Sequence, residues 1–371
     1  MCDVDQSTLH PRYIRFAHLR RPMSAIEGVI PAEIGLLSGL DMPVRTPETL
    51  IAEFDEEVRK RISSLKNNAR WQRHFLLKSF TTDIARDHSA ERWVHEAHLG
   101  TLEKLDALFV REGVYESVEL VAVARNAMEN LIWLKLMEKD IKFGIVFYAV
   151  LLDNQKSNQQ GFIDKIEAEI ALFDDMHVRD KEIHARTLVE PTKKEKLTEE
   201  QQAKLWVAHR AEAAALDESV RRKFCLYADD AAYNSYKIQA DLLREEGLPR
   251  HADRLAEIVA EKQRLEMALP SLVDFRLQNI ISNRWNWFER ANEVGLANQY
   301  RFLYSYSSKL LHSTPLNVIT EKHLSKAEEK MFLDYIVITS KDLLDLIEAF
   351  KYPGQVNAFF VEFPNHNKSS D

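Results

Sequence analysis

Residues 118–134 read Val118-Glu-Leu-Val-Ala-Val-Ala-Arg125-Asn-Ala-Met-Glu129-Asn-Leu-Ile-Trp-Leu134, without a glycine or a proline. Apolar side chains cover most of this stretch, which is typical of a helix buried in a protein core. Arg125 and Glu129 are four residues apart, so they lie one turn apart on the same helix face. The pattern predicts a core helix that carries a partly desolvated ion pair.

The rest of the chain also favours helices. Only 10 glycines and 11 prolines occur in 371 residues, and strong helix formers dominate. Helix starts are marked by Thr46 before Pro47 and by two capping boxes, and helix ends by glycines followed by an apolar residue. The capping boxes are Thr198–Gln201 and Ser325–Glu328, and the glycine signals are Gly113, Gly247 and Gly295.

These signals predict an all-α, multi-helix bundle with a projecting helical hairpin and a loop-rich N-terminal segment. The expected helices cover 46–68, 70–86, 89–112, 115–139, 140–152, 212–246, 250–268, 271–294, 297–313 and 325–350. Alternation at 358–363 predicts one short strand.

The chain is expected to divide where its composition changes. Polar residues from Asp153 onward interrupt the apolar pattern, and the amphipathic run 162–188 is followed by a lysine-rich break at 191–197, which predicts the hairpin. The expected parts are a loop-rich segment (1–45), a first part of the bundle (46–152), a polar helical insertion (153–211), a second part of the bundle (212–350) and an irregular tail (351–371).

Bulk properties exclude several classes of protein. Lys+Arg of 50 against Asp+Glu of 58 gives a net charge of −8, which argues against a broad nucleic-acid-coating surface but leaves a local basic groove open. Cys2 and Cys225 have neither disulfide-framework nor zinc-site spacing. The start is too polar for a signal peptide, and the longest apolar stretch, 141–152, is too short to cross a bilayer. We expect a soluble cytoplasmic protein without membrane contact.

A second helix carries the other candidate site residues. Tyr304, Ser308 and His312 recur at i, i+4 and i+8, which places three proton donors or acceptors along one helix face. We expect this face to pack against Arg125 and Glu129. Such a cluster is either a satisfied buried network that fixes helix register or a catalytic site with His312 as general base and Arg125 as the anion clamp.

The stretch 289–313 resembles the signature of a bacterial helical family catalogued only as a domain of unknown function. The family pattern is R-A-x-x-x-G-L-x-x-x-Y-x-x-L-Y-x-x-x-S-x-x-x-H-x-S, preceded by a helix with R-x-x-x-E. The matching residues are Arg290, Ala291, Gly295, Leu296, Tyr300, Leu303, Tyr304, Ser308 and His312, with Arg125 and Glu129 in the earlier element. The final serine of the pattern falls on Thr314, and the chain has Ser313 one position before it. The resemblance covers about 100–150 and 215–345; it supports the site residues without implying a reaction.

A looser resemblance is to the HEPN ribonucleases, helical domains of toxins and phage-defence proteins whose motif places Arg and His on one helix. The segment Arg179-Asp180-Lys-Glu-Ile-His184 matches that motif. A motif this short also matches by chance, and a solvated, charged helix face can carry the same residues. The resemblance implies metal-independent RNA cleavage in a phage-defence or stress setting, without a cofactor, and a homo-oligomer. The alternative is a non-enzymatic helical interaction or sensor module with a helical protein partner.

Other candidates favour structural readings. His95 and His98 have the spacing of surface residues more than of metal ligands, and Glu167, Glu169, Asp174 and Asp175 suggest a solvated acidic face. Trp285, Trp287 and Phe288 are expected in the core, with base stacking as the alternative. The sequence contains no phosphate-binding P-loop, dinucleotide fingerprint or serine-hydrolase elbow.

Overall fold

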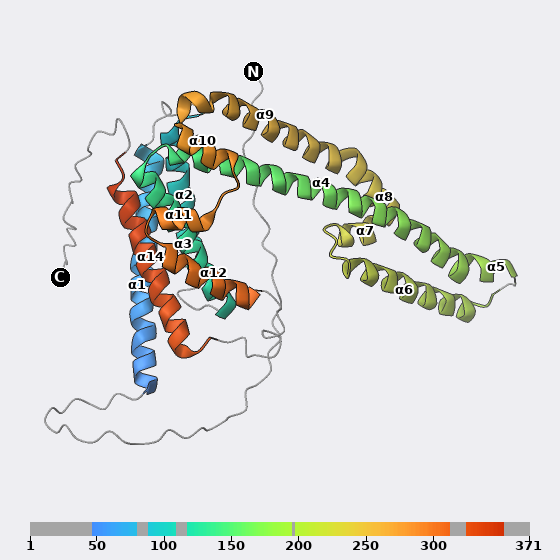
Figure 1. The fold of residues 1–371 in the computed structure, drawn as a ribbon. Helices are drawn as coiled ribbons and strands as arrows, with labels where there is room; N and C mark the ends of the chain where they lie inside the picture. The colour runs from blue at the N-terminus through green and yellow to red at the C-terminus, as the bar shows by residue number, and fades with distance from the viewer. Residues whose placement is uncertain (1–46, 80–87, 109–116, 195–196, 312–323, 352–371) are drawn as a thin grey trace, which may run out of the picture. The chain divides into compact units, whose positions relative to one another are not determined.

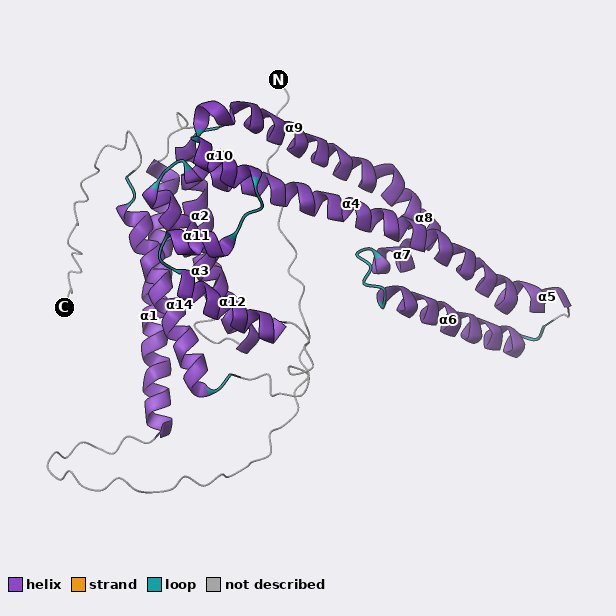
Figure 2. Cartoon of the chain, in the orientation of Figure 1, coloured by secondary structure: helices purple, strands orange, loops and turns teal. Residues whose placement is uncertain are grey.

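The computed structural model describes residues 47–79, 88–108, 117–194, 197–311 and 324–351. Most of these residues are in helices joined by short loops, and none is in a strand, as Figure 1 and Figure 2 show, so the expected all-α, multi-helix fold is confirmed. The loop-rich start, the strand expected at 358–363 and the tail lie outside the described residues. Among the described helices, none combines the length and the hydropathy of a membrane-spanning segment.

Two π-helical turns, Ala185–Val189 and Leu243–Gly247, interrupt the α-helices. The helices are α1 (Pro47–Ser79), α2 (Ala90–Leu108), α3 (Ser117–Lys139), α4 (Phe143–His184), α5 (Glu190–Lys194), α6 (Glu199–Arg221), α7 (Ala228–Asn234), α8 (Tyr236–Leu242), α9 (Leu248–Leu272), α10 (Phe275–Ser282), α11 (Trp287–Glu293), α12 (Ala297–Leu311) and α14 (Lys326–Ala349).

Helix α4 is longer than predicted. The expected helix end at residue 152 is wrong, because α4 is 42 residues long and extends from Phe143 to His184. Polar residues after Asp153 mark a change from a buried to a solvated helix surface, and no proline breaks the backbone hydrogen bonding there. The expected boundary between 152 and 153 therefore falls inside one helix. Likewise, α1 joins the helices expected at 46–68 and 70–86 into one.

Both π-helical turns end two residues before a proline. Val189 precedes Pro191 and Gly247 precedes Pro249, and in each case the chain remains helical on both sides. Proline has no N–H to donate within a helix, and a π-turn relieves its clash with the preceding turn. Gly247 accordingly has a right-handed φ of −63°, so the helix end predicted at this glycine is wrong.

Two other expected helices are broken. The helix predicted over 212–246 is interrupted after Arg221 and again at Ser235, where positive φ angles of 56° at Phe224 and 79° at Ser235 turn the chain. The helix predicted over 271–294 divides into α10 and α11. In that case Asp274 and Asn286 each accept backbone hydrogen bonds and begin a new helix.

The two capping boxes and the stop signal at Gly295 are confirmed, in contrast to the stop signal at Gly247. Thr198 and Gln201 form a reciprocal capping box at α6, and Ser325 and Glu328 form another at α14. Gly295 has a φ of 75° and ends α11, as the left-handed glycine predicts.

The buried side chains form two hydrophobic clusters that share helix α4. The larger combines the first part of α4 with α1, α2, α3, α9, α12 and α14, and includes Phe143 and Phe332. The smaller combines the second part of α4 with α6, α7 and α8 around Phe173 and Val220. The second part of α4 and helix α6 form a helical hairpin and lie side by side in Figure 1. Helix α6 continues to Arg221, so the boundary expected between 211 and 212 falls inside this helix and is wrong.

Candidate functional site

The expected ion pair on α3 is present. Arg125 Nε donates to Glu129 Oε1 at 2.8 Å, and the two side chains are 30% and 23% exposed. An ion pair at this depth is partly desolvated, so each charge depends on the other more than a surface pair does.

Helix α12 covers the guanidinium of Arg125 from the other side. Arg125 Nη1 donates to Ser307 Oγ at 3.4 Å, and its guanidinium carbon lies 5.2 Å from the ring centroid of Tyr304. Ser307 is fully buried and donates to the carbonyl of Tyr304 at 3.1 Å. Residues from two helices therefore hold one cation in a fixed orientation.

The structure brings together only part of the predicted α12 face. Ser307, rather than Ser308, contacts Arg125, while Ser308 is half-buried one position further along the helix. The buried stripe of α12 runs through Tyr300, Leu303 and Ser307, a three-then-four spacing that the sequence offers equally well. His312 lies outside the described residues.

The cluster reaches solvent at its Tyr304 side. Tyr304 is 48% exposed, and its ring stacks on that of Tyr300 with a centroid separation of 5.6 Å. Burial raises the pKa of the Tyr300 phenol, and the nearby Arg125 charge opposes this shift. Phe302, two residues before Tyr304 on the same helix, is also half exposed. The arrangement can therefore present a fixed guanidinium to an anion.

A second polar cluster joins three other segments. Glu261 of α9 accepts from Tyr148 Oη of α4 at 2.6 Å and from Arg264 Nε at 2.8 Å, and His88 Nε2 lies 3.2 Å from the same carboxylate. The Tyr148 ring in turn stacks on Trp93 of α2 at 3.7 Å. These contacts anchor α9 to α4 and α2.

This second cluster was missed at the sequence level, although one signal was available. Glu261 lies three residues after Ile258 and four before Leu265, both buried, so it occupies the apolar face of α9. A carboxylate in such a position needs hydrogen-bond donors from the facing helix.

The hydrogen bond from Tyr148, with further help from Arg264 and His88, lowers the pKa of Glu261 from 4.5 to about 2. A depressed carboxylate pKa stabilises the fold above the unfolded pKa near 4.5, and this stabilisation is lost as pH falls towards 2. We expect Glu261→Gln to lower the free energy of unfolding by about 2 kcal/mol at pH 7, and by progressively less below pH 4.5. Urea unfolding at pH 7, 4 and 3 measures this.

Glu257→Gln is the matched control, because Glu257 is 66% exposed and forms an ion pair with Arg254, which is also exposed. Its effect should stay within about 0.5 kcal/mol at every pH. A destabilisation by Glu261→Gln that does not change between pH 7 and pH 3 would contradict the ionic role of this carboxylate.

The two histidines on α2 are core residues, contrary to expectation. His95 is 7% exposed and His98 is 1% exposed, and the ring of His98 meets Phe350 edge-on at 5.1 Å. Burial lowers the pKa of His98 to about 3 and also lowers that of His95. No group of metal-ligating side chains occurs among the described residues.

The expected acidic face of α4 is only partly solvated. Glu167 is exposed, but Glu169 is 1% exposed and accepts from the backbone N–H groups of Leu226 and Tyr227 at 2.7 and 3.1 Å. Lys165 supplies a cation 3.3 Å away. Glu169 therefore holds the segment before α7 instead of contributing to a metal site.

The remaining sequence candidates occupy structural positions. Arg179 forms an exposed ion pair with Asp175 at 3.0 Å, which fits the solvated-face alternative for the Arg179–His184 motif. Trp285 stacks on Trp133 at 4.1 Å, and Trp285, Trp287 and Phe288 are partly buried and pack against the larger cluster, which favours the structural interpretation.

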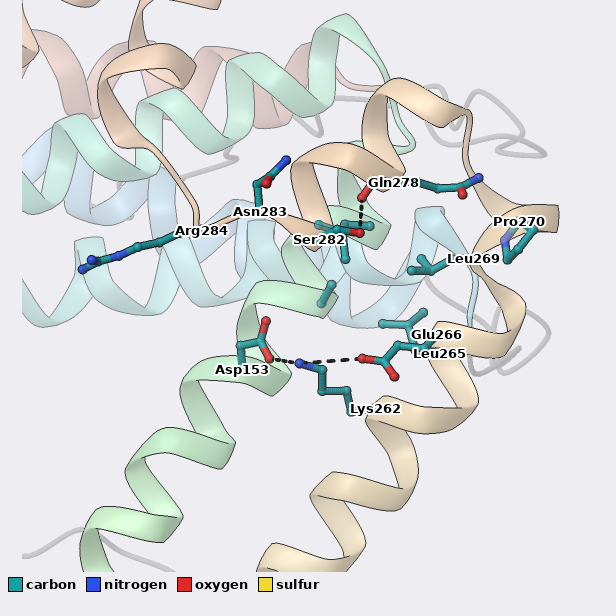
Figure 3. A pocket seen from close by; sticks show the side chains of 12 residues that line it. Asp153, Lys262, Leu265, Glu266, Leu269, Pro270, Gln278, Ser282, Asn283 and Arg284 are labelled. Atoms are coloured by element: carbon teal, nitrogen blue, oxygen red, sulfur yellow. Dashed lines mark hydrogen bonds and ion pairs between the residues drawn. The ribbon is translucent and has the colours of Figure 1, made fainter.

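Two cavities flank the paired helices α4 and α9. One, of about 590 Å³, lies between α4, α9 and α10 (Figure 3). The other, of about 440 Å³, is lined by Trp93, Tyr148 and Glu261. Neither is lined by Arg125 or Tyr304.

Comparison with known proteins finds no family model, no curated protein and no solved structure that matches this chain. The site is therefore interpreted from its own geometry.

Proposed function

We propose that the Arg125 cluster binds the phosphodiester backbone of RNA and supports metal-independent cleavage, in a phage-defence or stress setting. The observation that carries the proposal is the guanidinium of Arg125, which Glu129, Ser307 and Tyr304 orient from two helices while 30% of the side chain stays exposed. A fixed, partly desolvated guanidinium suits the charge that develops on phosphate oxygens during cleavage.

The chemistry assigns separate roles to the residues. His312 would accept the proton of the ribose 2′-hydroxyl, whose oxygen attacks phosphorus, while the bond to the 5′-oxygen breaks and that oxygen takes a proton from water. Arg125 would stabilise the non-bridging oxygens, and Tyr304 and Ser308 would hydrogen-bond the substrate. Glu129 would act through Arg125 as a positioning residue.

The test is incubation of purified wild-type protein, Arg125→Ala and His312→Ala with total RNA and transfer RNA. We expect cleavage by the wild type and a loss of at least about 100-fold in both variants. The control is Arg301→Ala, since Arg301 lies on the same helix as Tyr304 but stacks on Phe288, 4.6 Å from its ring. Absence of cleavage by the wild type, or full activity in Arg125→Ala, contradicts the proposal.

The second candidate is a non-enzymatic interaction or sensor module, in which the Arg125 network fixes helix register. The observation in its favour is the exposure of large apolar side chains around the smaller cluster, with Phe224 at 85% and Tyr233 at 91%. Under this alternative Arg125→Ala lowers the melting temperature without changing any RNA-cleaving activity. Light scattering of wild-type and Tyr233→Ser protein then reports whether these side chains support self-association.

A further inference from the structure

The cavity between α4, α9 and α10 combines an apolar wall with a polar rim. Its volume of about 590 Å³ is within the range of small-molecule sites. The apolar wall is formed by Ala149, Leu265, Leu269 and Ile281. Such a wall provides space for an aliphatic chain but no partner for a buried charge.

Carboxylates dominate one side of this cavity. The Lys262 ammonium lies between Asp153 and Glu266, in direct contact with the first and 3.8 Å from the second (Figure 3). Each carboxylate therefore uses one oxygen on Lys262 and keeps the other for a further donor. Two negative charges against one positive charge leave this side with a net charge of −1.

The uncharged polar groups of the rim also present acceptors. Gln278 donates to the carbonyl of Val273 at 3.0 Å, Ser282 to that of Gln278 at 2.9 Å and Asn283 to that of Asn279 at 2.7 Å. Because these side chains donate to backbone carbonyls, their oxygens remain available as acceptors.

The other cation of the lining, Arg284, lies apart from this group of charges. Figure 3 shows the side chain of Arg284 extending away from Asp153, Lys262 and Glu266. The cavity thus has acceptors and a negative charge beside an apolar wall, which is complementary to a donor-rich cation with a hydrocarbon tail.

We propose that this cavity is a binding site for a small primary alkylammonium ion, with Asp153 and Glu266 holding the ammonium and the apolar wall holding the chain. The site is separate from the Arg125 cluster and does not rest on the function proposed for it.

Calorimetric titration of the full chain with n-hexylamine tests the proposal. Binding should exceed that of 1-hexanol and of hexanoate at least roughly tenfold, because only the amine donates charged hydrogen bonds to the carboxylates. Affinity should also rise roughly fourfold for each methylene from butylamine to hexylamine if the apolar wall takes the chain. Equal binding of the amine and the alcohol, or no binding of the amine, overturns the assignment.

A matched pair of variants locates the site. Glu266→Gln removes one carboxylate charge and should weaken hexylamine binding roughly tenfold. Asp253→Asn removes one charge from an exposed part of the same helix and should leave the affinity within about twofold. Both positions are exposed, so both variants should retain the melting temperature of the wild type. Equal losses in the two variants would mean that the amine binds to surface charge and not to this cavity.

Discussion

Replacing Gly144 by alanine is expected to lower the free energy of unfolding by about 3 kcal/mol. A Cβ atom at this position would lie 2.3 Å from the carbonyl oxygen of Ala90 and 3.1 Å from Val94 Cγ2. The nearer atom belongs to the backbone of α2, so relief requires α2 and α4 to separate across the larger cluster. Urea unfolding followed by circular dichroism measures the change.

Gly161→Ala on the same helix is the control. A Cβ at Gly161 meets nothing within 4 Å, and alanine has the higher helix propensity. This variant should therefore gain about 0.5–1 kcal/mol. If the two substitutions have similar effects, then close packing of α2 on α4 is not the reason for glycine at position 144.

Replacing Glu169 by alanine is expected to lower the free energy of unfolding by about 3 kcal/mol, because it leaves two partly buried backbone N–H groups and the nearby Lys165 without their anion. The loss should appear first in the smaller cluster, since Glu169 fixes Leu226 and Tyr227 at the start of α7. Hydrogen exchange of these two amides, together with urea unfolding, measures the local and the global effect.

Glu167→Gln provides the comparison, since Glu167 is exposed two residues earlier on the same helix. It should change stability by less than about 0.5 kcal/mol and leave both amides protected. Retained protection of Leu226 and Tyr227 in Glu169→Ala would show that other contacts hold this segment.

The features that could be predicted from the sequence depend on neighbours within one turn or one cap. The capping boxes at Thr198 and Ser325, the left-handed Gly295 and the Arg125–Glu129 pair all belong to this class. The length of α4 was missed because a change from buried to solvated surface looks like a break in the apolar pattern.

The features that were missed depend on contacts distant in sequence. Tyr148 and Glu261 are 113 residues apart, and neither shows from its own neighbours that the other will be its partner. Whether Ser307 or Ser308 contacts Arg125 depends on how α12 is rotated about its axis relative to α3. Side chains at adjacent helix positions point about 100° apart, so a small rotation decides which of the two faces α3. The burial of His95 and His98 likewise depends on the helices that pack against α2, which include α3, α4 and α14.

Because α4 belongs to both hydrophobic clusters, its length is constrained during evolution. One residue inserted between Leu152 and Ile163 would turn every later side chain of α4 by about 100° and advance it by about 1.5 Å. Helix α9 packs along α4 and Gln159 bonds to His251, so a compensating insertion would be needed in α9. Natural length variants should therefore change α4 and α9 together, in steps near seven residues that restore the facing surfaces.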